Sequence, residues 1–377
     1  MKFTCKSDVL CQEIEYAYLF AGQKNSLSIS SNVLLEAAND SLTVKTTDQK
    51  TGFFSIISVN VVLPGATTVS CEYLLSALKW IGQSEVEITD ENGKLAIYDL
   101  SSKSSSPDVL ISVIAADKFP SLRTADDESY FVLPQRDIFD MVSKTSFAVS
   151  DDDTRFFLCG VYMEKRDGKL VMVATDGKRL AMVKRQFEQD IPDFPGAIIP
   201  VKFLTNMERI GTGEGLLSLS IEEGCIFARI GSRTFYSALI TGKEYPNYNR
   251  VIPQNLANAC VVKTKELDNA LSFSSVFVEN KSRKVLMIIE DGKFTIVGES
   301  EAGSGKRELE CSVEDASFKE TPGKKLSITF NCSVLQAPVK KVSSDFLRLK
   351  YNNPKSAMLI TPEPGSDYFF VVMPMMS

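Results

Sequence analysis

The sequence contains no histidine. Histidine is the commonest general base in enzymes, the usual activator of a serine or cysteine nucleophile, and a frequent zinc ligand. Its absence excludes Ser-His-Asp and Cys-His catalysis. The eight cysteines form no CxxC pair and show no metal-ligand spacing, so we expect reduced thiols, half of them in apolar runs, and no metal site. No motif indicates a cofactor.

Two kinds of segment are also missing. The GxxxxGK[ST] pattern of a phosphate-binding loop does not occur. Residues 303–306 (Gly-Ser-Gly-Lys) resemble it only superficially, and we expect them to form a turn between strands. No stretch approaches the ~18 apolar residues that span a bilayer, and the first residues have no apolar signal core. We therefore expect a soluble, cytoplasmic protein with no membrane contact.

The 42 basic residues are outnumbered by 48 acidic residues, and the net charge is −6. A uniformly basic surface for nucleic acid is therefore not expected, although a local basic surface is compatible with this balance. The basic residues on or beside predicted helices are Lys24, Lys79, Lys144, Lys202, Arg209, Lys340 and Lys341. Taken singly, each is a solvated side chain. If equivalent helices of tandem domains share one surface, these residues add up to a stripe that binds phosphates without reading sequence.

The sequence does contain a threefold internal repeat. Residues 41–48 recur as residues 169–176 and, more weakly, as residues 293–300. An interval of about 126 residues is too long for a solenoid repeat and fits tandem whole domains. We expect the domains to be residues 1–124, 125–250 and 251–377.

Each copy is predicted to contain a strand, a helix and three strands, and then the same series again. In the first copy, a strand at 2–6 precedes a helix from about Asp8, and a strand at 66–70 precedes a helix at 71–82. Its other strands are expected near residues 31–38, 41–48, 52–62, 85–90, 94–100 and 108–115. The later helices are expected near residues 135–148, 201–210, 264–276 and 332–342, with Pro338 kinking or shortening the last. Two helices on antiparallel sheets make each domain α+β.

Two segments each permit two interpretations. Residues 174–181 (Ala-Thr-Asp-Gly-Lys-Arg-Leu-Ala) form the densest polar motif, which is either a plain hairpin turn or part of a binding site. Residues 368–377 are apolar, rich in methionine and interrupted by Pro374. They form either a last core strand or the lining of an adaptable groove, since methionine suits a surface that accepts several partners.

The whole chain resembles the beta sliding clamp family, the processivity subunit of bacterial DNA polymerase III. The segments that carry the resemblance are residues 1–4, 64–69, 155–160, 174–181, 245–253 and 371–375. The resemblance implies a DNA-clamp fold of three similar domains. Two protomers would form a closed ring around double-stranded DNA, without sequence preference. The chain would be a non-catalytic replication factor.

The resemblance also implies partners and sites. The partners would be a second copy, the catalytic subunit of DNA polymerase III, the clamp loader, other polymerases and mismatch-repair proteins. Apart from the second copy, these proteins would dock through short linear motifs. The implied dimer contacts are Val276 and Phe277. The implied DNA-binding residues are Lys24, Lys79, Phe156, Phe157, Lys202 and Arg209. The implied peptide-binding cleft, between the second and third domains, comprises Arg155, Leu158, Thr175, Gly177, Lys178, Arg179, Leu180, Pro246, Arg250, Val251, Asn331, Val334, Ser356, Val371, Val372, Met373, Pro374 and Met375.

Four positions depart from the family's pattern and bear on peptide preference. Lys178 stands where histidine is frequent, and Met376 where arginine is common. Val334 and Ser282 replace residues that are frequently aromatic. Two alternatives of other classes stay open from the residues alone: an enzyme that uses Asp176 and neighbouring carboxylates, and a three-domain scaffold that does not bind DNA.

Overall fold

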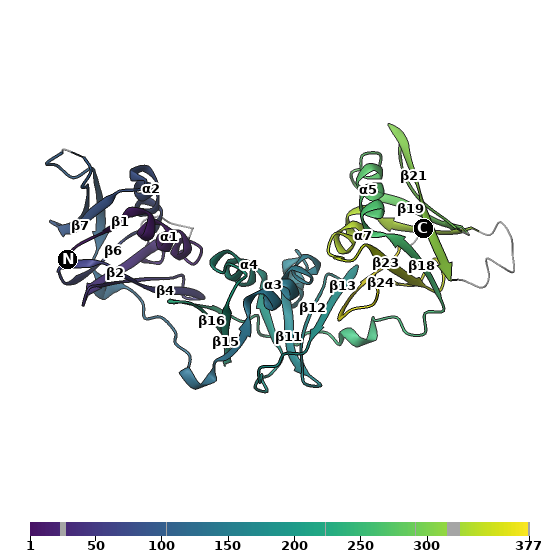
Figure 1. Cartoon of the computed structure of the whole chain (residues 1–377), viewed down its shortest axis with the longest axis horizontal. Helices are drawn as coiled ribbons and strands as arrows, with labels where there is room; N and C mark the ends of the chain where they lie inside the picture. The colour runs from purple at the N-terminus through teal and green to yellow at the C-terminus, as the bar shows by residue number, and fades with distance from the viewer. Residues whose placement is uncertain (23–27, 103, 223, 291, 315–324, 376–377) are drawn as a thin grey trace. The chain divides into compact units, whose positions relative to one another are not determined.

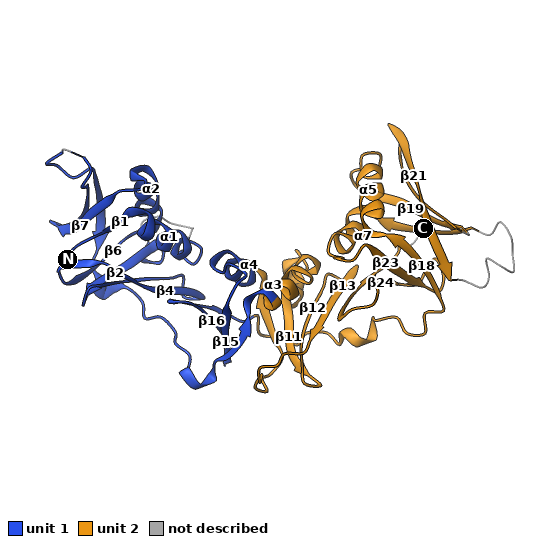
Figure 2. Cartoon of the chain, in the orientation of Figure 1, with its two compact units in different colours: residues 1–136, 202–239 blue, residues 137–201, 240–377 orange. Residues whose placement is uncertain are grey.

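The computed structural model describes residues 1–22, 28–102, 104–222, 224–290, 292–314 and 325–375, and it divides into two compact units (Figures 1 and 2). Unit 1 comprises residues 1–136 and 202–239, and unit 2 comprises residues 137–201 and 240–377. The division passes through the central third of the chain, which therefore contributes to both units.

Unit 1 contains a sheet in which 13 described strands pair in the order β10-β15-β16-β17-β4-β3-β2-β6-β9-β8-β7-β1-β5. The strands are β1 (Lys2–Lys6), β2 (Asn32–Ala38), β3 (Ser41–Thr47), β4 (Thr51–Ser58), β5 (Asn60–Leu63), β6 (Gly65–Ser70), β7 (Glu85–Glu91), β8 (Lys94–Asp99), β9 (Val109–Ile114), β10 (Phe131–Pro134), β15 (Leu216–Glu222), β16 (Cys225–Ile230) and β17 (Arg233–Ala238). Antiparallel pairing of β17 with β4 joins the first third of the sequence to the second.

The helices of unit 1 cover this sheet through apolar faces. They are α1 (Ser7–Tyr18), α2 (Cys71–Ile81) and all but the first residue of α4 (Val201–Ile210). Helices α1 and α2 pack against each other, and α1 also packs on β3 and β4. The inner face of α1 carries Leu10, Ile14 and Ala17, which are fully buried. Phe20 lies with its ring centroid 5.8 Å from that of Phe53 in β4 and 5.7 Å from that of Phe235 in β17, so the core is continuous across the β17–β4 pair.

Unit 2 contains the second antiparallel sheet, in which 12 described strands pair in the order β14-β11-β12-β13-β25-β24-β23-β18-β21-β20-β19-β22. The strands are β11 (Gly160–Arg166), β12 (Lys169–Thr175), β13 (Arg179–Arg185), β14 (Ala197–Pro200), β18 (Asn258–Lys263), β19 (Lys284–Glu290), β20 (Lys293–Ser300), β21 (Gly303–Glu314), β22 (Leu326–Asn331), β23 (Phe346–Tyr351), β24 (Met358–Glu363) and β25 (Tyr368–Val372). Pairing of β13 with the last strand, β25, makes one sheet of the second and third thirds of the chain.

The helices assigned to unit 2 are most of α3 (Gln135–Ser143), α5 (Thr264–Ser274) and α7 (Cys332–Val339). Helices α5 and α7 pack together, and α5 lies on β20 and β21. Short 3-10 helices are η1 (Ile29–Ser31), η2 (Ala116–Lys118), η3 (Asp127–Ser129), η4 (Ser146–Ala148), η5 (Asp153–Leu158) and η6 (Tyr248–Arg250). The predicted α+β class is confirmed, and the helix containing Pro338 is short, ending at Val339.

Three predicted elements differ from the structure. The helix expected over 135–148 ends at Ser143, because Thr145 turns its hydroxyl back onto the carbonyls of Met141 and Val142 and a separate 3-10 helix follows. The strand expected over 52–62 divides into β4 and β5. Residues 303–306 do not form a turn but begin β21. Gly305 is needed there because a Cβ would lie 2.3 Å from Cδ2 of Phe277.

Candidate functional site

The polar motif at residues 174–181 forms the hairpin between β12 and β13, and it also orders two arginines. Asp176 Oδ1 accepts hydrogen bonds from the backbone nitrogens of Lys178 (2.8 Å) and Arg179 (2.9 Å). Its Oδ2 lies 3.1 Å from Nε of Arg179. Gly177 has a φ of +85°, which glycine adopts without strain. Arg155 Nη1 donates to the carbonyl oxygen of Asp176 at 3.1 Å. The turn therefore holds two guanidinium groups beside one exposed loop.

The C-terminal segment is fixed by backbone hydrogen bonds on both sides. In the β13–β25 pair, Leu180 lies opposite Val371. Past the strand, the nitrogen of Met373 donates to the carbonyl of Lys178 (2.8 Å), and that of Met375 donates to the carbonyl of Thr329 in β22 (2.8 Å). The core-strand interpretation of this segment is confirmed for residues 368–372. It is a core strand as far as Val372, and beyond it the side chain of Met373 is 44% exposed.

An apolar cluster lies below the hairpin and the last strand. Its buried members are Val171, Val173, Leu180, Met182, Tyr248 and Val371, with Tyr162, Tyr245, Ile252, Ala357, Leu359 and Phe369 packed against them. We call this set the floor cluster. It brings together two predicted cleft residues from strands almost 200 residues apart, Leu180 and Val371. Residues 245–251 border it, and within them Pro246, Arg250 and Val251 are exposed.

The other predicted cleft residues are engaged locally. Leu158 is buried at the end of η5. Thr175 Oγ1 donates to the carbonyl of Arg179. Asn331 caps α7, because its Oδ1 accepts from the nitrogen of Val334 and its Nδ2 donates to the carbonyl of Ser282. Ser356 hydrogen-bonds within its own turn. The predicted set is thus brought together most clearly around the β12–β13 hairpin and the C-terminal segment. The hydrogen bonds of Val334 and Ser356 are local, at the start of α7 and in the turn between β23 and β24.

The predicted DNA-binding residues divide between the units. In unit 1, Lys202 and Arg209 are exposed on α4, whereas the ammonium of Lys79 lies 2.8 Å from Glu15. The hydrogen bond that Lys79 donates to Glu15 raises the pKa of Lys79, and the carboxylate partly offsets its charge. In unit 2, Phe156 is exposed, and Lys243 Nζ lies 4.0 Å from the centre of the Phe157 ring. Lys24 lies outside the described residues.

The two predicted dimer residues differ in their surroundings. Val276 is 75% exposed just beyond α5. Phe277 packs on its own domain, with its ring centroid 5.3 Å from that of Phe273 and its edge against Gly305. Residues 303–310 of β21 pair with β20, and among the described strands their other edge is unpaired.

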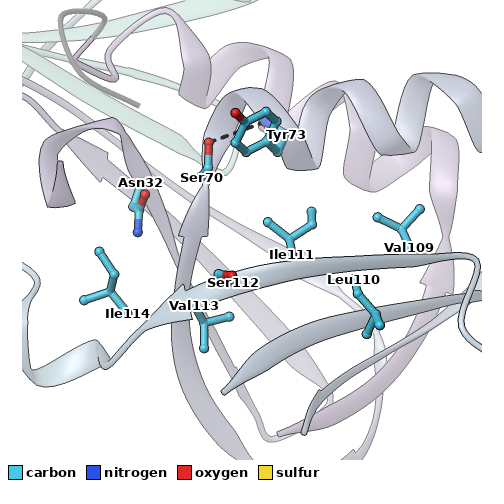
Figure 3. A pocket seen from close by; sticks show the side chains of 9 residues that line it. All are labelled: Asn32, Ser70, Tyr73, Val109, Leu110, Ile111, Ser112, Val113 and Ile114. Atoms are coloured by element: carbon cyan, nitrogen blue, oxygen red, sulfur yellow. Dashed lines mark hydrogen bonds between the residues drawn. The ribbon is translucent and has the colours of Figure 1, made fainter. Parts of the chain in front are cut away.

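Sequence reasoning missed a second apolar surface, in unit 1. A pocket of about 500 Å³ lies between β6, α2 and β9 (Figure 3). Its lining residues are Asn32, Ser70, Tyr73, Val109, Leu110, Ile111, Ser112, Val113 and Ile114. On the same helix as Tyr73, Trp80 is 91% exposed. The signal was present in the sequence: Tyr73 and Trp80 are seven residues apart, on the face of α2 opposite to the buried Leu74 and Leu78.

No cluster of side chains suited to a metal ion occurs among the described residues. No helix in the described part of the chain is long and apolar enough to cross a membrane.

Comparison with known proteins gives one family over the full length. Models of the N-terminal, central and C-terminal domains of the DNA polymerase III beta subunit match residues 1–123, 132–247 and 249–376. The beta sliding clamp of Treponema pallidum (strain Nichols) is 32% identical over 380 residues, covering 100% of this chain and 99% of that protein. That of Proteus mirabilis is 26% identical, with complete coverage of both. The crystal structure of the DNA polymerase III subunit beta from Pseudomonas aeruginosa superposes with a TM-score of 0.89 at 25% identity, covering 100% of each chain.

Proposed function

Since the chain belongs to the DNA polymerase III beta subunit family, the sliding clamps, we propose that two copies close head to tail into a ring around duplex DNA. The ring would tether the replicative polymerase and so make synthesis processive. The observation that carries this proposal is the match of all three domains, in order, over the whole chain. We place the domains at residues 1–124, 125–250 and 251–377 and the protein in the cytoplasm, where replication takes place.

Two surfaces with unpaired strand edges support closure of the ring. Domain 1 offers the pocket of Figure 3 together with residues 109–112 of β9, which pair with β8 but not with β6. Domain 3 offers the unpaired edge of β21 and the exposed Val276. An antiparallel pair between β9 of one copy and β21 of the other would satisfy both edges. The apolar side chains beside each edge would be buried in the same contact.

DNA would be retained by topology rather than by tight binding. The net charge of −6 is unfavourable for wrapping a polyanion. The exposed Lys202 and Arg209 lie on one helix, and Lys79 is partly offset by Glu15. A few such contacts give weak, salt-sensitive attraction to phosphates without base recognition. Weak contacts would let the ring slide, and its closure would keep it on a closed circle.

Protein partners would dock on the surface formed by the β12–β13 hairpin, residues 245–251 and the C-terminal segment. An apolar floor with a few polar groups around it suits a short peptide. Here Arg179 precedes Leu180 of the floor cluster, Arg250 lies two residues after Tyr248, and Met373 is open to solvent. We propose the catalytic subunit of DNA polymerase III, the clamp loader, other polymerases and mismatch-repair proteins as its partners. The positions of Lys178 and Val334 would set which peptide sequences bind best.

The test is retention on DNA of defined topology. The protein is placed on nicked circular plasmid by a clamp loader with ATP and isolated by gel filtration, and the circle is then cut with a restriction enzyme. We expect it to co-elute with the circle and to be lost from the linear product unless bulky blocks cap both ends. Equal retention of the protein on circular DNA and on linear DNA with free ends would contradict the ring. No retention on either, despite an active loader, would favour a scaffold that does not bind DNA.

A further inference from the structure

One strand below the proposed docking surface has three consecutive side chains on one face that all contact the same loop. Tyr162, Glu164 and Arg166 alternate along β11, and alternate residues of a strand point to one side. We call them the β11 row. Glu164 Oε1 accepts the hydroxyl of Tyr248 at 2.5 Å, and its Oε2 accepts the hydroxyl of Tyr162 at 3.2 Å. One carboxylate therefore joins the strand to the loop.

The other two members of the β11 row, Tyr162 and Arg166, also contact the loop. The ring of Tyr162 stacks on that of Tyr245, with centroids 4.8 Å apart and planes 9° apart. Arg166 Nη1 donates to the hydroxyl of Tyr248 (3.4 Å) and to Oδ1 of Asn249 (3.2 Å). Residues 245–249 are thus held at three points. They need such support because, among residues 239–257, regular structure is limited to the three-residue η6.

The loop held by these contacts, residues 245–251, forms one side of the proposed docking surface. Pro246 lies within it, and Arg250 and Val251 follow directly; all three are exposed. Tyr248, by contrast, is only 5% exposed and belongs to the floor cluster together with Leu180 and Val371. Tyr248 therefore both contacts the β11 row and connects residues 245–251 to the floor cluster.

We propose that the β11 row positions the peptide-binding surface, with Glu164 as its central residue. This inference rests on the proposed docking of partner peptides. Glu164 does not touch the peptide but acts through Tyr248, fixing where Pro246 and Arg250 lie. A carboxylate makes a strong acceptor for a hydroxyl, and two tyrosines share this one. Without it, the hydroxyl of Tyr248 is left buried without its principal acceptor, and the loop gains conformations that do not fit the peptide.

The experiment measures affinity for a fluorescein-labelled peptide copied from the C-terminus of the same organism's polymerase III catalytic subunit, by anisotropy. The variants are Glu164→Ala, Glu164→Gln, Tyr248→Phe and the double variant Glu164→Ala with Tyr248→Phe. We expect about tenfold weaker binding for the alanine and phenylalanine variants, the size of one lost hydrogen bond to a charged group. The double variant should be no weaker than either single change, because both remove the same bond. Glu164→Gln keeps an acceptor oxygen and should bind within about twofold of wild type.

Two further readouts separate positioning from general stability. Hydrogen exchange of Glu164→Ala should speed up in residues 247–251 and not in unit 1. The matched control is Glu13→Ala, which breaks a buried ion pair with Arg233 in unit 1. It should lower the melting temperature and leave peptide affinity unchanged.

Wild-type affinity in both Glu164→Ala and Tyr248→Phe would overturn the inference. So would a Glu164→Gln variant as weak as Glu164→Ala. If Glu164→Ala does not fold, Tyr248→Phe decides, since it lacks only one oxygen. Wild-type protein that fails to bind the peptide and its counterparts from the clamp loader would refute the proposed docking surface itself.

Discussion

Replacing Trp80 by glutamate should break the proposed dimer. The side chain is 91% exposed on α2, the helix whose Tyr73 lines the pocket of Figure 3, and an exposed tryptophan is typical of an interface. A buried tryptophan covers on the order of 200 Å², and at ~25 cal/mol per Å² this sets a ceiling of about 5 kcal/mol. Truncated interface anchors commonly lose about 2 kcal/mol.

The proposed head-to-tail arrangement would double this effect. A ring of two copies has two identical interfaces, so the variant loses about 4 kcal/mol in total, which weakens dimerisation about a thousandfold. Sedimentation velocity over a concentration series measures the dissociation constant of the dimer. Trp80 is also the only tryptophan in the sequence, so its fluorescence in the wild-type protein reports on the interface alone. Its emission should shift to longer wavelength when the dimer is diluted into monomers.

The matched control is Phe156→Glu, which changes an exposed aromatic residue in unit 2 that the proposed interface does not include. It should leave the dimer intact. The reasoning would be refuted if Trp80→Glu dimerised within threefold of wild type. It would also be refuted if wild-type emission stayed constant while sedimentation showed dissociation.

Three further results are expected. Glu13→Ala should lower the free energy of unfolding by about 3 kcal/mol in urea denaturation, since it leaves Arg233 without the partner that α1 supplies across the β17–β4 pair, and an unchanged midpoint would contradict this. Met373→Ala combined with Arg179→Ala, or deletion of residues 373–377, should weaken peptide binding about tenfold to a hundredfold in a protein that still folds, because Met373 is 44% exposed beyond the last strand and Arg179 begins β13 beside the turn; wild-type anisotropy curves would show the surface to be elsewhere. Burial and the hydrogen bond to Glu164 raise the pKa of Tyr248 to about 12 from an ordinary value near 10. Above about pH 10 the folded state therefore binds more protons than the unfolded state, and the free energy of unfolding should fall between about pH 10 and 12. Urea denaturation at pH 9 and 11 measures this, and Tyr248→Phe should lose less free energy of unfolding over that interval.

Local patterns in the sequence predicted most of the elements, because turns and amphipathic helices depend on nearby residues. Between the strands expected at residues 85–90 and 94–100, for example, Asn92 and Gly93 both adopt the positive φ that a tight hairpin requires. The glycines at 303–305 were misinterpreted because glycine serves two purposes. It makes turns, but Gly305 makes room for the ring of Phe277, a contact that no local pattern contains.

The candidate site was predictable only in part, for the same reason. The hairpin around Asp176 and the apolar end of the chain were each recognisable, but their joining through Leu180 and Val371 depends on strands almost 200 residues apart. The β11 row was not recognised at all. Glu164 has an ordinary strand neighbourhood in the sequence, and its role follows only from where Tyr248 lies.

The pairing of β17 with β4 has a practical consequence for anyone who dissects this protein. Cutting the chain at its repeat boundaries looks natural, because each repeat has its own helices and strands. A fragment that ends at residue 124 would nevertheless lose the strand that covers β4, exposing backbone donors and acceptors along residues 51–55. Such a piece would be prone to stick to other copies through that edge. Fragments that retain residues 202–239 beside residues 1–136, joined by a short linker, should stay in solution instead.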